Sequence, residues 1–275
     1  MTDAETTEQL DTWFRCFNPA VRPGSAPGSW RPEPGLRLVC FPHGGGTAGF
    51  YRPWARALPP DVQLLAVSYP GRLDRMREPF ATDLHELAER ITNSLTAVLH
   101  QPMAFFGHSM GATVAYEVAR RIEQRTEGVL TQLIVSGQPA PSMVRHTAKH
   151  LLNDAALWDE ACRLGGIPDK LAGSPEMRKL AVPSLRSDYR LNETYWPCPA
   201  PPLTCPVLAL AGDNDSEASV EEVRAWETVA GGEFALRVFP GGHFYLIPEQ
   251  AELLRELVAW LARHHPFPGR SASSG

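Results

Sequence analysis

The sequence predicts an α/β fold with a mostly parallel, doubly wound sheet, and two observations lead to this prediction. Short apolar runs alternate along the chain with stretches in which apolar residues recur at helical spacing. Continuous apolar runs are typical of strands covered by helices on both faces, and parallel neighbours need a crossover, usually a helix. The alternating order of the two patterns therefore indicates an α/β architecture.

Each element follows from one of these patterns. Six apolar runs are predicted strands: Leu36–Phe41, Val62–Val67, Met103–Phe106, Leu133–Val135, Val207–Ala211 and Phe234–Phe239. The segment Trp13–Phe17 could add an antiparallel edge strand. Helical spacing predicts helices over Leu84–Val98, Ala112–Arg125 and Leu254–Leu261.

One long segment interrupts the alternation. Roughly 70 residues separate the strand that ends near Gly137 from the strand that begins near Val207, too many for an ordinary loop. A first helical face in this segment carries Leu151, Ala155, Trp158 and Cys162. A second helical pattern starts near Glu176, and Pro183 is expected to kink that helix or restart it. We predict a helical lid over residues 140–202, lying over the carboxyl edge of the sheet.

The composition fits a single globular domain over residues 1–275. It is 43% hydrophobic and 21% charged, which argues against global disorder. The formal net charge of −5 gives no reason to expect nucleic-acid binding. Proline and glycine in 22–35 predict a flexible loop, and 266–275 is a predicted disordered tail.

Cysteine usage and the chain ends indicate the compartment. The five cysteines are odd in number and form no C-x-x-C pair, as expected for reduced thiols in a cytoplasmic protein. The polar, acidic start lacks the apolar core of a signal peptide, and no apolar stretch is long enough to span a membrane. We expect a monomer, because no coiled-coil pattern or long exposed apolar stripe appears.

The strongest motif is Gly107-His108-Ser109-Met110-Gly111, a G-x-S-x-G sequence between a predicted strand and a predicted helix. This context is typical of a nucleophile elbow, in which a strained strand-to-helix turn exposes a serine hydroxyl. Glycine flanks are needed where strand and helix approach closely. We predict Ser109 as a nucleophile and an α/β-hydrolase fold.

A nucleophilic serine needs a base and an orienting acid. In this fold they follow in the order serine, acid, histidine. His243 is the one later histidine that directly follows a predicted strand. Asp213 and Asp215 both follow the preceding strand; we favour Asp215 as the acid and expect Asp213 to brace the turn.

The remaining requirement is a site that stabilises the oxyanion. One amide is expected from Met110, the residue after the nucleophile. The glycine-rich loop Pro42–Gly46 resembles an H-G-G-G oxyanion loop, and we predict Gly44 as the second donor. No metal or organic cofactor is expected, because no cluster has metal-ligand spacing.

Together, five segments resemble the type II thioesterases of polyketide and nonribosomal-peptide biosynthesis: FPHGGG, SYPGRLDR, FFGHSMGA, ALAGDND and GGHFYL. The resemblance runs from about Trp13 to Leu261. The family's early motif is usually P-H-A-G-G, and here Gly44 replaces the alanine. The resemblance implies the same catalytic and oxyanion residues: Ser109, Asp215, His243, Gly44 and Met110. It also implies hydrolysis of acyl groups from the phosphopantetheine arm of an acyl or peptidyl carrier protein.

The residues support a carrier-protein partner only weakly. Arg72, Arg186 and Arg190 could steer an acidic carrier protein, or could be ordinary solvated arginines. Aromatic and apolar residues of the lid could line an acyl pocket or form the core of the lid: Trp158, Leu185, Tyr189, Tyr195 and Trp196.

Three other functions remain open from the sequence. They are a carboxylesterase or lipase, a medium-chain fatty-acyl carrier-protein thioesterase, and a non-catalytic binding protein of the same fold.

Overall fold

The computed structural model describes residues 10, 12–18 and 34–265. The predicted flexible loop at 22–35 falls almost entirely outside these residues, as does the predicted tail at 266–275. Within the described part of the chain, no helix combines the length and the apolar character needed to cross a bilayer.

The core of the molecule is a seven-stranded sheet with the order β1-β3-β2-β4-β5-β6-β7. The strands are β1 (Phe14–Cys16), β2 (Leu36–Phe41), β3 (Val62–Val67), β4 (Met103–His108), β5 (Leu130–Ser136), β6 (Val207–Gly212) and β7 (Phe234–Phe239). All neighbours pair in parallel except β1, which pairs antiparallel with β3. All six predicted strands and the antiparallel edge strand are therefore confirmed, with β4, β5 and β6 longer than predicted.

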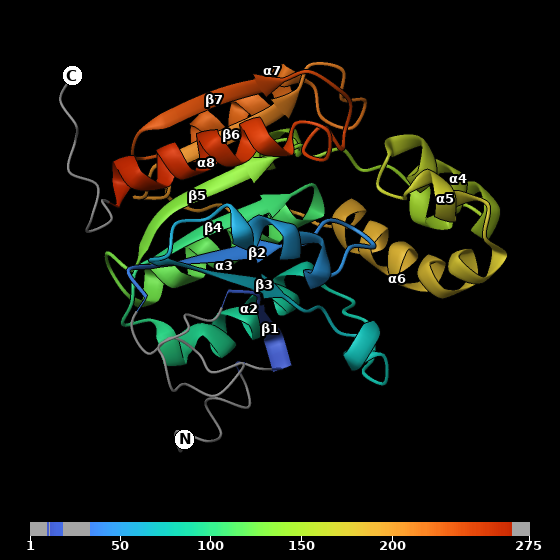
Figure 1. Ribbon diagram of the computed structural model, residues 1–275, viewed down its shortest axis with the longest axis horizontal. Coiled ribbons are helices and arrows are strands. Elements are labelled where there is room, and N and C mark those ends of the chain that lie inside the picture. Colours follow the sequence, from blue (N-terminus) through green and yellow to red (C-terminus); the bar gives the residue numbers. More distant parts are fainter. Residues whose placement is uncertain (1–9, 11, 19–33, 266–275) are drawn as a thin grey trace.

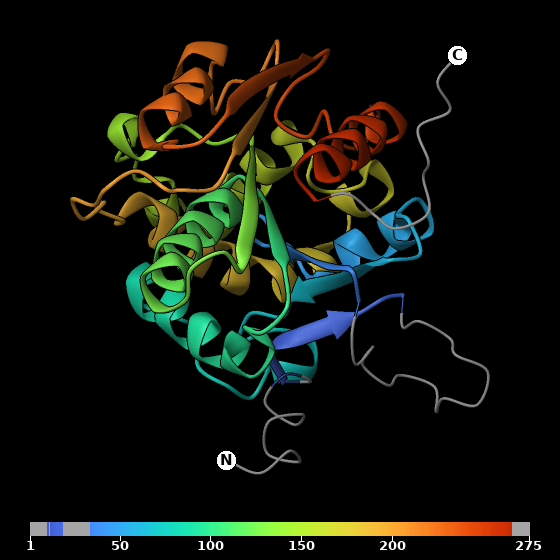
Figure 2. The ribbon, with the colours of Figure 1, turned by 90° about the vertical axis from the view of Figure 1, so that its left-hand side faces the viewer.

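Helices cover both faces of the sheet (Figures 1 and 2). The longer ones around the sheet are α2 (Leu84–Leu95), α3 (Met110–Arg125) and α8 (Gln250–His264), with a short α7 (Val220–Arg224) and the 3-10 segment η1 (Ala48–Arg56). One apolar core holds α2 and α3 against one face, and a second holds η1 and α8 against the other. This division confirms the doubly wound α/β prediction and explains why the central strands are buried on both sides.

The segment predicted as a lid contains three helices beyond the carboxyl ends of the strands (Figure 1). They are α4 (Asp154–Leu164), α5 (Asp169–Ala172) and α6 (Pro175–Glu193), preceded by the 3-10 turn η5 (Lys149–Leu151). We call residues 140–202 the insert. A small apolar cluster of its own joins α4 and α6 through Leu157, Trp158, Ala161, Val182 and Leu185.

One detail of the insert differs from the prediction, and for another the structure decides between two alternatives. Leu151 does not share a helix face with Trp158, because it lies in η5 and is 74% exposed. Pro183 does not restart a helix, because α6 runs through it without interruption, and a kink at this residue stays a prediction. The buried neighbours Val182 and Leu185 anchor α6 on both sides of the proline, so packing outweighs the lost backbone hydrogen bond.

Candidate active site

Ser109 occupies the sharp turn between β4 and α3. Its backbone has φ 53° and ψ −130°, a conformation that non-glycine residues rarely adopt. Its N–H donates to the carbonyl of Ser136 at 2.8 Å. A Cβ at Gly107 would lie 2.2 Å from the Gly111 oxygen, and one at Gly111 would lie 2.1 Å from the Phe41 oxygen. Both flanking positions therefore require glycine for the close approach of strand and helix.

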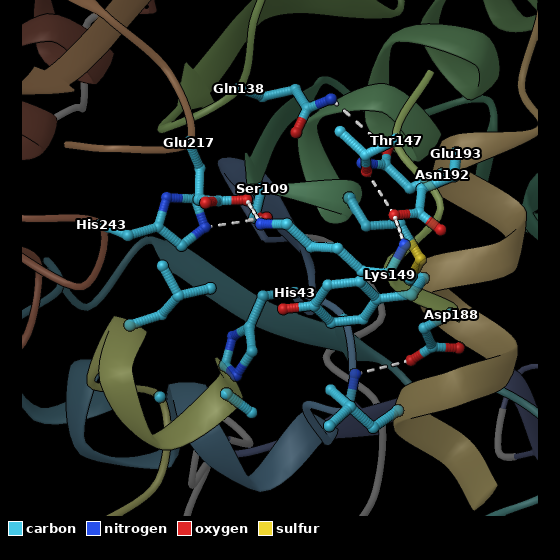
Figure 3. Close-up of a pocket in the computed structure, with 18 of the residues that line it drawn as sticks. His43, Ser109, Gln138, Thr147, Lys149, Asp188, Asn192, Glu193, Glu217 and His243 are labelled. Atoms are coloured by element: carbon cyan, nitrogen blue, oxygen red, sulfur yellow. Dashed lines mark hydrogen bonds and ion pairs between the residues drawn. The ribbon is translucent and has the colours of Figure 1, made fainter. Parts of the chain in front are cut away.

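The loops after β6 and β7 bring an acid and a histidine to this serine. His243 Nε2 lies 3.0 Å from Ser109 Oγ (Figure 3). On the other side of the ring, Nδ1 lies 2.9 Å and 3.1 Å from the two carboxylate oxygens of Asp215. With Nδ1–H donating to the carboxylate, Nε2 is left to accept the serine proton. The imidazole is 4% exposed and the carboxylate is fully buried.

The two candidate aspartates have separate partners. Asp215 Oδ1 also accepts hydrogen bonds from the backbone N–H of Glu217 at 2.8 Å and Ala218 at 3.3 Å. Asp213 instead accepts the N–H of Gly241 at 2.8 Å, which ties its turn to the loop that carries His243. The structure thus brings Asp215, and not Asp213, to the imidazole.

The glycine-rich loop lies beside the serine. Gly44 and Met110 line the same cavity as Ser109 and His243. The next amide, that of Gly45, donates to Asp188 Oδ2 at 2.7 Å and so already has an acceptor within the protein. This arrangement is consistent with Gly44 and Met110 as the oxyanion donors, a role that stays a prediction.

Two buried histidines surround His243. The ring centroid of His108 lies 5.0 Å from that of His243 and 6.1 Å from that of His43. Burial lowers the pKa of His43 to about 3 and lowers that of His108 well below its usual value. His108 Nδ1 lies 2.9 Å from Ser136 Oγ, which lies 2.6 Å from the Tyr245 hydroxyl. His243 therefore has two uncharged imidazoles beside it at neutral pH.

The cavity over the serine has a volume of about 360 Å³. It lies between the sheet edge and the insert, and Figure 3 shows His243 and Glu217 facing Asp188, Asn192 and Glu193 of α6 across it. Its apolar lining comes mainly from the insert: Val144, Ala161, Leu164, Ile167, Ala181 and Leu185. The size lies at the small end of the range for ligand pockets.

Some of the large side chains of the insert line the cavity, and others pack in the protein core or lie on the surface. Leu185 and Tyr189 line the cavity. Trp158 packs in the insert's own core and donates to the Ala172 carbonyl, and buried Tyr195 donates to Glu117. Trp196 stacks on His146, with 68% of the residue exposed.

The three candidate steering arginines differ in their surroundings. Arg72 does not offer a free charge, because it is only 8% exposed and forms an ion pair with Asp188 at 2.6 Å. Arg186 pairs with exposed Asp154 at 2.7 Å, and Arg190 is exposed on α6. Contact of Arg186, Arg190, Tyr189 and Trp196 with a carrier protein stays a prediction.

Two residues for which the sequence predicts no role, Asp188 and Lys149, also line the site. Asp188 holds the glycine-rich loop, and Lys149 bridges Glu217 at 2.6 Å and Glu160 at 2.7 Å. Hydrogen bonds from Arg163 and Lys149 lower the pKa of Glu160 to about 2. Asp188 lies in the segment PSLRSDYRLNETY, but only the folded chain brings it to a loop 143 residues away.

Among the residues that the structure describes, no group of three or more histidine, cysteine or acidic side chains is arranged to hold a metal ion.

Known proteins resemble this chain over most of its length. A family model for the thioesterase domain matches residues 36–261. Thioesterase PikA5 of Streptomyces venezuelae is 41% identical over 259 residues, covering 94% of this chain and 88% of that protein.

Solved structures agree with this match. The type II thioesterase BorB from the borrelidin biosynthetic cluster superposes with a TM-score of 0.81 and 43% identity, covering 91% of this chain and 98% of that one. RedJ, a thioesterase of the prodiginine pathway in Streptomyces coelicolor, gives 0.79 and 38%, with 86% and 96% covered. These similarities confirm the predicted resemblance and the α/β-hydrolase fold. The chain belongs to the thioesterase domain family and is a thioester hydrolase of the serine-hydrolase type.

Proposed function

We propose that this protein is a type II editing thioesterase, which removes acyl groups from the phosphopantetheine arm of acyl or peptidyl carrier proteins. The hydrogen-bonded series Ser109–His243–Asp215, facing a cavity beneath the insert, is the observation that carries the proposal. A relative named for gramicidin S biosynthesis, and a solved type II thioesterase named for the yersiniabactin NRPS/PKS pathway, support the carrier-protein substrate.

The first half-reaction transfers the acyl group to the enzyme. His243 Nε2 takes the proton of the Ser109 hydroxyl as Oγ attacks the thioester carbonyl. The resulting oxyanion is stabilised by the amides of Gly44 and Met110. The carbon–sulfur bond then breaks, and the pantetheine sulfur leaves with the proton from His243. A thiol has a pKa of about 8.5, so it departs more readily than an alcohol.

The second half-reaction frees the acid. His243 takes a proton from a water molecule as the water oxygen attacks the acyl-serine carbonyl. The bond to Ser109 Oγ breaks, and the serine recovers its proton from His243. Throughout, Asp215 orients the imidazole and stabilises its charged form without taking the proton.

The test is to incubate acyl-loaded carrier proteins with the wild type and with Ser109→Ala, and to follow acyl loss by mass spectrometry. We expect the variant to be slower by at least about a thousandfold, because it lacks the nucleophile. Ser184→Ala is a matched control, since the hydroxyl of this buried serine on α6 donates to the Ala181 carbonyl of the same helix at 2.8 Å. Equal acyl loss from wild type and Ser109→Ala would refute the proposal.

The same assay separates the other functions. Faster turnover of simple oxygen esters than of acyl-pantetheine would indicate a carboxylesterase. A strong preference for medium chains on a fatty-acid carrier protein would indicate a chain-releasing thioesterase. No turnover by the wild type, with carrier protein still bound, would indicate a non-catalytic protein.

A further inference from the structure

We infer that Asp188 and Arg72 act together as positioning residues that hold the Pro42–Gly46 loop in the orientation needed to stabilise an oxyanion. The inference rests on the proposed function, since it assigns a role in the same reaction. Neither residue touches the reacting atoms; both would act through the backbone of the loop.

The loop is anchored to side chains on both sides of Gly44. Asp188 Oδ2 accepts the N–H of Gly45 at 2.7 Å, and Arg72 Nη1 donates to the carbonyl of Gly46 at 3.0 Å. At the start of the loop, the Tyr69 hydroxyl donates to the carbonyl of Pro42 at 3.2 Å. The bond to Asp188 fixes the peptide plane between Gly44 and Gly45, and the bond to Tyr69 fixes the start of the loop. The Gly44 N–H lies between these two anchors, so its direction depends on the backbone torsions of a few residues.

The anchor is rigid because the two charged groups are paired and buried. Arg72 donates to both carboxylate oxygens of Asp188, each at 2.6 Å. The side chains are 8% and 2% exposed, so water does not compete for these bonds. Burial alone would lower the pKa of Arg72, but the charge and hydrogen bonds of Asp188 raise it. A bidentate pair of this kind has one strongly preferred geometry.

The geometry also links the insert to catalysis. Asp188 lies on α6 of the insert, whereas Arg72 and the glycine-rich loop follow strands of the sheet. Figure 3 shows Asp188 reaching from α6 toward the loop, with a dashed line for the bond to the Gly45 amide. Correct placement of the Gly44 amide therefore requires α6 to be docked. The ion pair bonds two successive residues of this loop, Gly45 and Gly46, and so fixes the orientation of the loop backbone as well as joining α6 to the sheet edge.

The test uses a variant that removes both charges. Asp188→Ala alone would leave Arg72 buried and unpaired, which destabilises the protein, whereas replacing a buried pair with apolar groups of similar volume is often tolerated. We therefore choose Arg72→Met with Asp188→Leu. Asp188→Asn is a milder second variant, because its uncharged amide has a single acceptor oxygen, whereas both carboxylate oxygens of Asp188 are used by Arg72 and Gly45. Asp154→Asn, which weakens the exposed ion pair between Asp154 of α4 and Arg186 of α6, is the control.

The expected result is specific to the oxyanion. In the double variant, kcat on an acyl-pantetheine thioester should fall about 10- to 100-fold while KM stays within about threefold. The affinity for a trifluoromethyl ketone, which adds to serine and forms a bound oxyanion, should fall in the same proportion. Asp188→Asn should show a smaller loss of the same kind, and Asp154→Asn should match the wild type.

Two outcomes would overturn the inference. One is a folded double variant with wild-type kcat and wild-type affinity for the ketone. The other, if the double variant fails to fold, is an Asp188→Asn protein that is folded and unchanged in both measurements. The ketone needs only a reactive serine and an oxyanion site. A wild type that binds the ketone but cleaves no thioester would therefore refute the proposed function alone.

Discussion

Asp213 and Asp215 stand two residues apart on one turn, yet their carboxylates have different partners. Asp215 is fully buried and faces His243 Nδ1, while Asp213 accepts the backbone N–H of Gly241. The difference arises because the chain turns at residues 213–214, directly after β6, so the strand geometry that would place residues two apart on the same face no longer holds. Sequence reasoning favoured this assignment from the distance of each residue beyond the strand.

This difference gives a matched pair of variants. Asp215→Asn should lower kcat/KM on an acyl-pantetheine thioester by about a thousandfold or more, because the amide favours the wrong imidazole tautomer. Asp213→Asn keeps an oxygen for the Gly241 N–H and should stay within about threefold of the wild type. Steady-state kinetics on both purified variants provides the measurement. Similar losses in the two variants would contradict the assignment of Asp215.

At the scale of elements, the loop after β2 must fit closely against α6. Gly45 has φ +73°, and a Cβ there would lie 2.9 Å from Leu185 Cδ1. At Gly44, a Cβ would meet nothing closer than Asp188 Cβ at 3.6 Å, which is ordinary contact. Gly44 stands where the family's P-H-A-G-G pattern has alanine, and the space around it accommodates either residue.

The two glycines should respond differently to alanine. Gly44→Ala should keep the activity within about twofold and the unfolding free energy within about 0.5 kcal/mol. Gly45→Ala should destabilise the protein by at least about 1–2 kcal/mol and lower kcat, because a positive φ is strained for alanine and the Leu185 side chain must shift. Urea unfolding and thioester kinetics on the two proteins would check this. A fully stable, active Gly45→Ala protein would contradict it.

At the scale of the whole molecule, charged side chains hold the insert against the sheet edge. Lys149 and Arg163 from the insert both pair with Glu217, two residues after Asp215, and with Glu160 of α4. Lys149 and Glu217 also line the cavity. The position of α4 is thereby coupled to the loop that carries the orienting acid.

Removing the central cation should loosen the insert. Lys149→Met should lower the opening free energy of the insert by about 1 kcal/mol, a value typical of partly exposed pairs, so α4 amides should exchange about fivefold faster. Hydrogen–deuterium exchange of Asp154–Leu164 measures this, with β4 amides as the internal reference. Arg255→Met, which removes an exposed pair within α8, is the control and should leave α4 unchanged. Unaltered exchange in Lys149→Met would show that these ion pairs do not hold the insert.

Local pattern determined much of this protein. The apolar runs identified the six parallel strands, and the order of strand and helix determined the doubly wound sheet, because period and burial are properties of neighbouring residues. Gly107–Gly111 identified the serine for the same reason: strained turn and flanking glycines are adjacent in the chain. His243 and Asp215 followed from the rule that loops at the carboxyl ends of parallel strands meet at one edge.

Only the tertiary structure determined the contacts made across the insert. Leu151 has the spacing of a helix face but lies exposed in η5, and Pro183 lies inside an unbroken helix because the packing around it is strong enough. The pairing of Arg72 with Asp188 joins residues 116 positions apart, so no local pattern marks it. The sequence gives no sign that Arg72 is buried. Its burial depends on α6, which carries Asp188 and packs against the glycine-rich loop. Long-range contacts of this kind depend on how separate elements pack, which short-range spacing does not encode.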